Sequence, residues 1–135
     1  DWPTYPAFQE ILGDKGVGVT YATFESDKLK LSPLGEKFKK AYKAKYDVDP
    51  PVFALFLYDE VMILAETMER IKSSDPKDIA AGLKDTKFEG TTGLITFERQ
   101  EGPGPIWNQW MGHQLFINKL TAVEGKGYKR EQIYP

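Results

Sequence analysis

His113 is the side chain with the widest chemical repertoire in this sequence, and it has few partners for catalysis. It is the only histidine, and the chain has no cysteine, so a conventional metal site or a thiolate centre lacks its other ligands. A Ser–His–acid triad would need partners that the spacing around His113 does not suggest. We therefore interpret His113 as a hydrogen-bonded histidine at the edge of a strand.

Adjacent carboxylates at Asp59 and Glu60 lie early in a predicted helix. Two carboxylates divide acid and base roles only when both reach the substrate, whereas neighbours on a helix point about 100° apart. We expect Asp59 to complement the helix dipole. Glu66 and Arg70, four residues apart, are expected to form a surface ion pair.

Charge and glycine spacing exclude further classes of function. Lys and Arg total 18 against 20 Asp and Glu, a net charge of -2, which argues against a dedicated nucleic-acid binder. The lysine-rich stretch 28–45 is interpreted as a solvated helix face. Four glycines in the second half of the chain match neither a phosphate-binding loop nor a dinucleotide fingerprint. They are Gly90, Gly93, Gly102 and Gly104. We predict no cofactor, no metal and no enzymatic activity.

The aromatic residues exceed what three short helices can bury. Some fill a core or an interface, and others line an apolar ligand cleft in which a few polar groups set orientation. The sequence leaves both fates open for this set: Trp2, Tyr5, Phe8, Phe53, Phe56, Tyr58, Trp107 and Trp110.

Capping signals define the helices that position these residues. Ser32-Pro33 and Asp75-Pro76 each place a capping side chain before a proline at the first helical position, which predicts helices over 32–46 and around 79–83. The strongest helix is predicted over 53–71, buried nearly all round in its first half. Its expected apolar stripe consists of Leu57, Val61, Leu64, Ala65, Met68 and Ile71.

Strand signals are sparser than helix signals. A short helix ending at Gly13 precedes Val17 to Phe24, which we predict to be a strand buried on both faces, as in parallel sheets. Residues 94–97 and 114–118 have strand composition, residues 102–105 form a rigid loop, and the tail from Gly125 is charged and weakly patterned.

The order of these elements is unbalanced for a self-contained fold. Three helices follow one strand, whereas parallel α/β sheets need a strand between successive helices. The chain starts abruptly in an aromatic, Pro-rich stretch and has no apolar run long enough for a membrane span. We therefore expect a fragment of a larger α/β protein.

Two motifs resemble the type I periplasmic binding proteins of the Leu/Ile/Val class. Residues 53–66 are similar to a family helix with a Tyr-Asp-Ala-Val core; Tyr58-Asp59 is kept and Glu60 replaces the alanine. Residues 88–98 are similar to the closing pattern F-x-G-x-x-G-x-I-x-F-D. The likeness runs from about residue 11 to residue 120. It departs at residues 99–105, which replace the usual Gly-Asp.

The resemblance implies a partial type I periplasmic-binding-protein fold, a Rossmann-like α/β lobe from a fold of two lobes joined by three crossovers. Residues 1–135 would be the C-terminal segment of an extracellular ligand-binding domain. The implied function is the solute-binding component of an ABC importer, periplasmic or extracellular, which binds an amino acid or similar small solute between the lobes and docks on a membrane permease.

Ligand-contacting positions follow from the same resemblance. By position, Asp1 would receive the ammonium group of the ligand, and Phe53 would form an aromatic wall beside its side chain. Simple packing of Phe53 at a helix start is an equal alternative.

Two other functions stay open: a ligand-sensing receptor domain on the same fold, and a small α/β enzyme subunit, which would need a titratable cluster in a pocket. We expect the isolated segment to bind solute weakly or not at all. Unpaired sheet edges and unburied aromatics predict self-association, including a homodimer.

Overall fold

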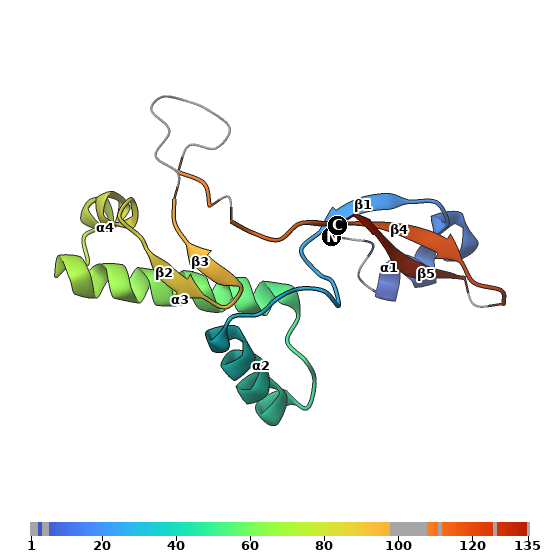
Figure 1. Cartoon of the computed structure of the whole chain (residues 1–135), viewed down its shortest axis with the longest axis horizontal. Helices are drawn as coiled ribbons and strands as arrows, with labels where there is room; N and C mark the ends of the chain where they lie inside the picture. Colours follow the sequence, from blue (N-terminus) through green and yellow to red (C-terminus); the bar gives the residue numbers. More distant parts are fainter. Residues whose placement is uncertain (1–2, 4–5, 98–107, 111, 126, 135) are drawn as a thin grey trace. The chain divides into compact units, whose positions relative to one another are not determined.

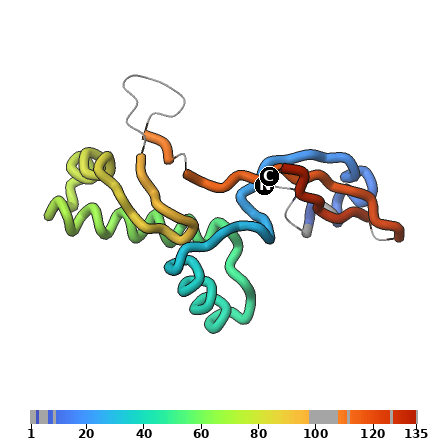
Figure 2. Tube along the Cα trace, in the orientation of Figure 1, coloured from blue at the N-terminus to red at the C-terminus, as the bar shows by residue number. Residues whose placement is uncertain are grey.

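The chain divides into two compact units in its computed structural model, which describes residues 3, 6–97, 108–110, 112–125 and 127–134. The terminal unit comprises residues 1–29 and 114–135, and the central unit comprises residues 30–113. Figure 1 labels the elements of both units. In Figure 2, blue N-terminal chain and red C-terminal chain come together in the terminal unit. The polypeptide therefore passes twice between the units.

The terminal unit is a three-stranded sheet with one short helix. Helix α1 (Pro6–Leu12) leads into a 3-10 turn, η2 (Gly13–Gly16). The strands are β1 (Thr20–Thr23), β4 (Phe116–Ala122) and β5 (Tyr128–Tyr134). They lie in the order β1-β4-β5, and both pairings are antiparallel.

The core of the terminal unit lies on one face of β4. Phe116, Asn118 and Leu120 alternate inward along this strand, and Leu120 is completely buried. Tyr128, at the start of β5, packs its ring over Gly16, where an added Cβ would lie 2.5 Å from Tyr128 Cε1. Only glycine leaves room for that ring.

The structure corrects two predictions for this unit. The strand expected over 17–24 is shorter and pairs antiparallel with β4, and its Thr20 and Ala22 are exposed, so the prediction of a parallel strand buried on both faces was wrong. The tail from Gly125 forms β5, because pairing with β4 satisfies the backbone of a segment whose charged side chains hide the strand pattern. The strand predicted at 114–118 begins at Phe116 and continues to Ala122.

The described part of the central unit contains three helices and a hairpin. Its helices are α2 (Pro33–Tyr46), α3 (Val52–Ile71) and α4 (Pro76–Leu83). Strands β2 (Phe88–Gly90) and β3 (Gly93–Ile95) pair antiparallel. Among the described residues, no helix is both long and apolar enough to cross a membrane.

Both predicted helix caps are confirmed. The Ser32 hydroxyl accepts a hydrogen bond from the Gly35 N–H at 3.1 Å, and the Asp75 carboxylate accepts one from the Lys77 N–H at 2.8 Å. Each cap satisfies one N–H group that the first helical turn leaves without a partner. The predicted rigid loop, residues 102–105, lies outside the described residues.

Helix α3 packs through a face other than the predicted one. Its buried residues are Val52, Leu55, Asp59, Ile63 and Thr67, whereas the predicted stripe members Leu57, Val61, Leu64 and Met68 are exposed. The expectation of a first half buried nearly all round was therefore wrong. Apolar residues surround much of the helix, so their periodicity alone does not select the face that meets the hairpin and α4.

The end of α3 is joined to α4 by close backbone approach. Gly82 lies against Thr67 and Ile71, where an added Cβ would meet methyl groups at 2.9–3.0 Å. Arg70, which we predicted to pair with Glu66, donates a hydrogen bond from its guanidinium to the Gly82 carbonyl at 3.0 Å. Its role is to connect two helices.

Candidate functional site

Asp59 is a buried carboxylate at the centre of the central unit. Its side chain lies in the hairpin turn and is 2% exposed. The Thr91 N–H is shared between both carboxylate oxygens at 2.9 Å, and the Thr91 hydroxyl donates to Oδ2 at 2.7 Å. The carboxylate of the Tyr58-Asp59 pair therefore holds the turn between β2 and β3.

Thr91 also joins this turn to the start of α2. Its carbonyl accepts a hydrogen bond from the Ser32 N–H at 2.9 Å, and the Ser32 hydroxyl donates to the Gly90 carbonyl at 2.6 Å. Gly35 packs so closely on the Thr91 carbonyl that an added Cβ would overlap that oxygen. We call Ser32, Asp59 and Thr91 the Thr91 node; it fastens α2, α3 and the hairpin together.

The glycines of the second motif are explained by the same packing. At Gly90 an added Cβ would lie 2.9 Å from Asp59 Oδ2 and 2.6 Å from Ile95 Cδ1, and Gly93 has φ 132°, a conformation that side chains rarely adopt. Gly90 leaves room for the Asp59 carboxylate, and Gly93 adopts the backbone conformation of the turn. The spacing G-x-x-G thus follows from the hairpin that Asp59 anchors.

Burial raises the pKa of Asp59 above its ordinary value of 3.8, although the Thr91 side-chain and backbone hydrogen bonds act in the opposite direction. We expected Asp59 to complement the helix dipole, but the structure gives it the different role of anchoring Thr91. Its donors all come from one residue of the same unit. This arrangement is structural, because both carboxylate oxygens are buried and accept hydrogen bonds from Thr91.

Of the two predicted ligand-contacting residues, only Phe53 can be located. Asp1 lies outside the described residues. Phe53 is on the first turn of α3 and is 42% exposed. Its ring meets Phe56 edge to face at 6.2 Å, and Phe56 meets Trp110 in the same manner at 6.4 Å. Phe53 is therefore the exposed end of a row of aromatic rings that continues through Phe56 to Trp110.

Trp110 and His113 complete this row. The Trp110 indole N–H donates to the Leu94 carbonyl at 3.1 Å, and the His113 ring lies 5.9 Å from the Trp110 ring. His113 Nδ1 is 3.1 Å from the Trp110 carbonyl oxygen. The prediction of a hydrogen-bonded histidine is confirmed, although His113 lies three residues before the start of β4 and not on a strand edge.

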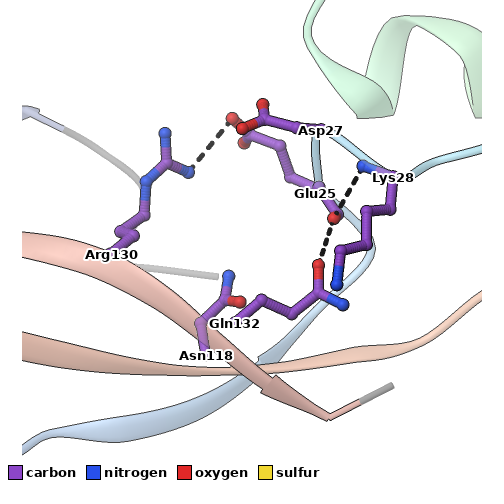
Figure 3. Close-up of a pocket in the computed structure, with 7 residues that line it drawn as sticks. Glu25, Asp27, Lys28, Asn118, Arg130 and Gln132 are labelled. Carbon is purple, nitrogen blue, oxygen red and sulfur yellow. Dashed lines mark hydrogen bonds and ion pairs between the residues drawn. The ribbon is translucent and has the colours of Figure 1, made fainter.

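A polar pocket of about 380 Å³ occurs within the terminal unit (Figure 3). It is lined by Glu25, Ser26, Asp27, Lys28, Asn118, Arg130 and Gln132. Figure 3 shows Arg130 reaching Glu25, a contact of 3.2 Å, while the Ser26 hydroxyl donates to the Gln132 side chain. These bonds attach the segment that follows β1 to the last strand.

The charges of this pocket balance one another. Partial burial disfavours the charge of Arg130, but the interactions with Glu25 and Tyr21 together outweigh this and raise the pKa of Arg130. Both side chains are 44% exposed, so solvent screens the pair and its contribution to stability is small. Across the described residues, no three His, Cys, Asp or Glu side chains are grouped to hold a metal ion.

Comparison with known proteins tests the resemblance that the two motifs carry. The family model for "Periplasmic binding protein" matches residues 6–116, which include elements of both units. The chain belongs to the periplasmic binding protein family. The resemblance to periplasmic binding proteins, predicted from the Tyr-Asp helix and the glycine turn, is thereby confirmed.

Relatives of this periplasmic binding protein chain agree with that assignment. The leucine-, isoleucine-, valine-, threonine- and alanine-binding protein of Pseudomonas aeruginosa is 29% identical over 93 residues, 67% of this chain and 24% of that protein. A leucine-binding protein, LivK, of Thermotoga maritima matches with a TM-score of 0.64 and 26% identity over 96% of this chain and 35% of its own.

More distant structures show the same fold. LivJ of Streptococcus pneumoniae, solved with isoleucine, has a TM-score of 0.56 and 23% identity, and covers 94% of this chain and 33% of its own. A Rhodopseudomonas palustris solute-binding protein, solved with 3,4-dihydroxybenzoic acid, has the same score and identity, with 91% and 33% covered. The chain spans about a quarter of the curated relative and a third of the solved ones. These relatives are solute-binding proteins, not enzymes.

The Thr91 node and the terminal-unit pocket were not found by sequence reasoning. The sequence contains the two motifs that form the node, Tyr-Asp and G-x-x-G. Neither motif indicates that the two are in contact. Glu25 and Arg130 are 105 residues apart. No local pattern pairs residues at that separation.

Proposed function

We propose that this chain is part of the solute-binding component of an ABC importer, which captures an amino acid or a related small solute in the periplasm. The observation that carries the proposal is the match of 96% of the chain, elements of both units included, to a leucine-binding protein. On closing, the receptor docks on a membrane permease.

In this proposal, residues 1–135 are the C-terminal segment of an extracellular ligand-binding domain. The remaining cleft surface comes from the part of the relatives that the chain does not span, two thirds of the solved structures. The chain alone then offers the ligand only some of its contacts. A small ligand needs most of its surface buried for appreciable affinity.

Asp1 and Phe53 are the ligand-contacting residues of the proposal. A carboxylate at Asp1 would receive the ammonium group of an amino acid through a charge-assisted hydrogen bond. Phe53 would cover the apolar side chain of the ligand; its exposure and its place at the end of the Phe53–Phe56–Trp110 row support this role. Phe56 fixes the Phe53 ring from behind, which limits the entropy lost on binding.

Calorimetry with a panel of leucine, isoleucine, valine, threonine, alanine, benzoate and 3,4-dihydroxybenzoate tests the proposal. We expect the 135-residue chain to bind weakly or not at all, and the full-length protein that carries it to bind one solute class with micromolar affinity or better. Micromolar binding by the chain alone would contradict the partial-cleft proposal. Absence of binding by the full-length protein to every solute would contradict solute capture from this class.

Substitutions in the full-length protein test the two residues. Asp1→Asn is expected to weaken amino-acid binding about tenfold or more, and Phe53→Ala about tenfold, because each removes a direct contact. Tyr46→Ala serves as a matched control, since Tyr46 is also an exposed aromatic of the central unit. An equal loss of affinity in the Tyr46 and Phe53 variants would remove Phe53 from the site.

A further inference from the structure

The ring of Phe53 is backed by two further rings of the central unit. Phe53 meets Phe56 edge to face at 6.2 Å, and Phe56 meets Trp110 edge to face at 6.4 Å. Exposure falls along this row, because Phe53 is 42% exposed whereas Phe56 and Trp110 are half-buried. Edge-to-face pairs at such separations attract one another. The orientation of the Phe53 ring therefore depends on Phe56, and that of Phe56 depends on Trp110.

Trp110 is itself fixed at its other end. Its indole N–H donates a hydrogen bond to the carbonyl of Leu94 in β3 at 3.1 Å. Gly112 lies beside this bond, and a Cβ added there would lie 2.7 Å from the indole nitrogen. The His113 ring meets the Trp110 ring edge to face at 5.9 Å. A strand, a close backbone approach and a neighbouring ring therefore hold the indole in place.

The strand that holds Trp110 belongs to a hairpin that is fastened to α3. Thr91, in the turn of this hairpin, donates hydrogen bonds to the Asp59 carboxylate of α3. Phe53 and Phe56 lie on the first two turns of the same helix. The contacts therefore run from α3 through Trp110 to the hairpin and back to α3. A ring supported in this way loses little conformational entropy when it contacts a ligand.

We propose that Trp110 is a positioning residue for the solute site, and that it orients Phe53 through Phe56. The inference rests on the role of Phe53 in the proposed function. Side chains that contact a ligand need supporting residues that lock their rotamers, because a loosely held contact loses much of its effect. The ring contact with Phe56 and the hydrogen bond to Leu94 give Trp110 both ends of such a support.

A double-mutant cycle in the full-length protein tests this role by calorimetry with the same solute panel, from leucine to 3,4-dihydroxybenzoate. Trp110→Leu should raise the dissociation constant about fivefold, because Phe56 loses its edge-to-face partner. In the Phe53→Ala background the same change should have less than about a twofold effect, because its route to the solute is gone. Tyr46→Leu is the matched control, since Tyr46 pairs with Tyr42 outside this row, and it should have little effect in either background.

Trp110→Phe separates the ring from its hydrogen bond. Phenylalanine keeps an aromatic partner for Phe56 but loses the bond to the Leu94 carbonyl. Its dissociation constant should therefore lie between those of the unmodified protein and of Trp110→Leu. If circular dichroism shows that Trp110→Leu does not fold, the same cycle with Trp110→Phe decides the question.

The cycle distinguishes this inference from the proposed function. Equal losses of affinity from Trp110→Leu in both backgrounds would overturn the positioning role, because Trp110 would then act independently of Phe53. A loss from Phe53→Ala without one from Trp110→Leu would also overturn it, but would leave Phe53 as a solute contact. Loss of affinity from neither variant would remove Phe53 from the site, and the positioning role with it.

A fluorine label tests the positioning without any solute. With para-fluorophenylalanine in place of Phe53 in the full-length protein, the fluorine NMR signal reports the surroundings of that ring. Trp110→Leu should move the signal toward its position in the urea-unfolded protein, whereas Tyr46→Leu should leave it unchanged. An unchanged signal in Trp110→Leu would overturn the proposal, even if no solute of the panel binds.

Discussion

On one side of α3, Asp59 and Thr67 are buried together with Leu55 and Ile63; on the other side, Leu57, Val61 and Leu64 are exposed. The buried face thus contains a carboxylate and a hydroxyl, while the exposed face is wholly apolar. This difference shows that specific contacts with neighbouring residues determine which face of α3 is buried. Asp59 is buried because Thr91 supplies its hydrogen bonds, whereas Leu57, Val61 and Leu64 remain exposed among the described residues.

The largest expected contrast between the faces comes from two neighbouring residues. Ile63→Ala should lower the free energy of unfolding by about 3 kcal/mol, because it leaves a cavity in the core. Leu64→Ala, an equal loss of volume on the exposed face, should change it by less than about 0.5 kcal/mol. Urea denaturation of both variants measures the two changes. Equal losses would show that both faces are buried in solution.

The second contrast concerns the buried carboxylate. Asp59→Ala should cost about 2 kcal/mol of stability, because the Thr91 N–H and hydroxyl are left buried without an acceptor. The adjacent Glu60→Ala changes an exposed carboxylate and should be nearly neutral. Asp59→Asn keeps one acceptor and should fall between them. The Asp59 role would be refuted by an alanine variant as stable as the Glu60 control.

The smallest effect is a pH dependence of that same carboxylate. Burial raises the pKa of Asp59 above 3.8 in the folded state, so the folded protein keeps a proton that the unfolded chain has lost. Between 3.8 and the raised value, stability therefore falls as the pH rises. Below 3.8 both states are protonated and the penalty is absent.

Denaturation of the unmodified chain and of Asp59→Asn at several pH values isolates this contribution, because asparagine does not titrate. The unmodified chain should lose stability relative to the variant as the pH rises from 3.8 through the raised pKa of Asp59. A relative gain as the pH rises toward 3.8 from below would instead mean that the Thr91 hydrogen bonds outweigh burial and that the pKa is lowered.

Much of the central unit was predictable, because its signals are local. Ser32-Pro33 and Asp75-Pro76 specify helix starts through atoms two or three residues away. The glycine turn was recognised for a similar reason, since Gly93 alone among its neighbours adopts the required φ. Such features depend on short-range sterics and hydrogen bonds, and the sequence contains them in full.

Features that depend on distant partners were missed or misjudged. Strand β5 was assigned to a weakly patterned tail, because Lys129, Arg130 and Glu131 become a strand only by pairing with β4. Strand β1 was expected to be parallel and buried on both faces, yet its neighbour comes from the far end of the chain. The site residues Asp1 and Phe53 rest on resemblance, and their roles remain predictions.

By itself the sequence determined the family, the helix boundaries and the lack of a recognisable catalytic set, because motifs and caps are encoded in consecutive residues. Tertiary structure decided which face of α3 is buried, what Asp59 binds and how the two ends of the chain share one sheet. Each of these depends on contacts between residues distant in sequence. Hydrophobic periodicity indicates that a helix has apolar sides. Only the elements that pack against the helix determine which side is buried.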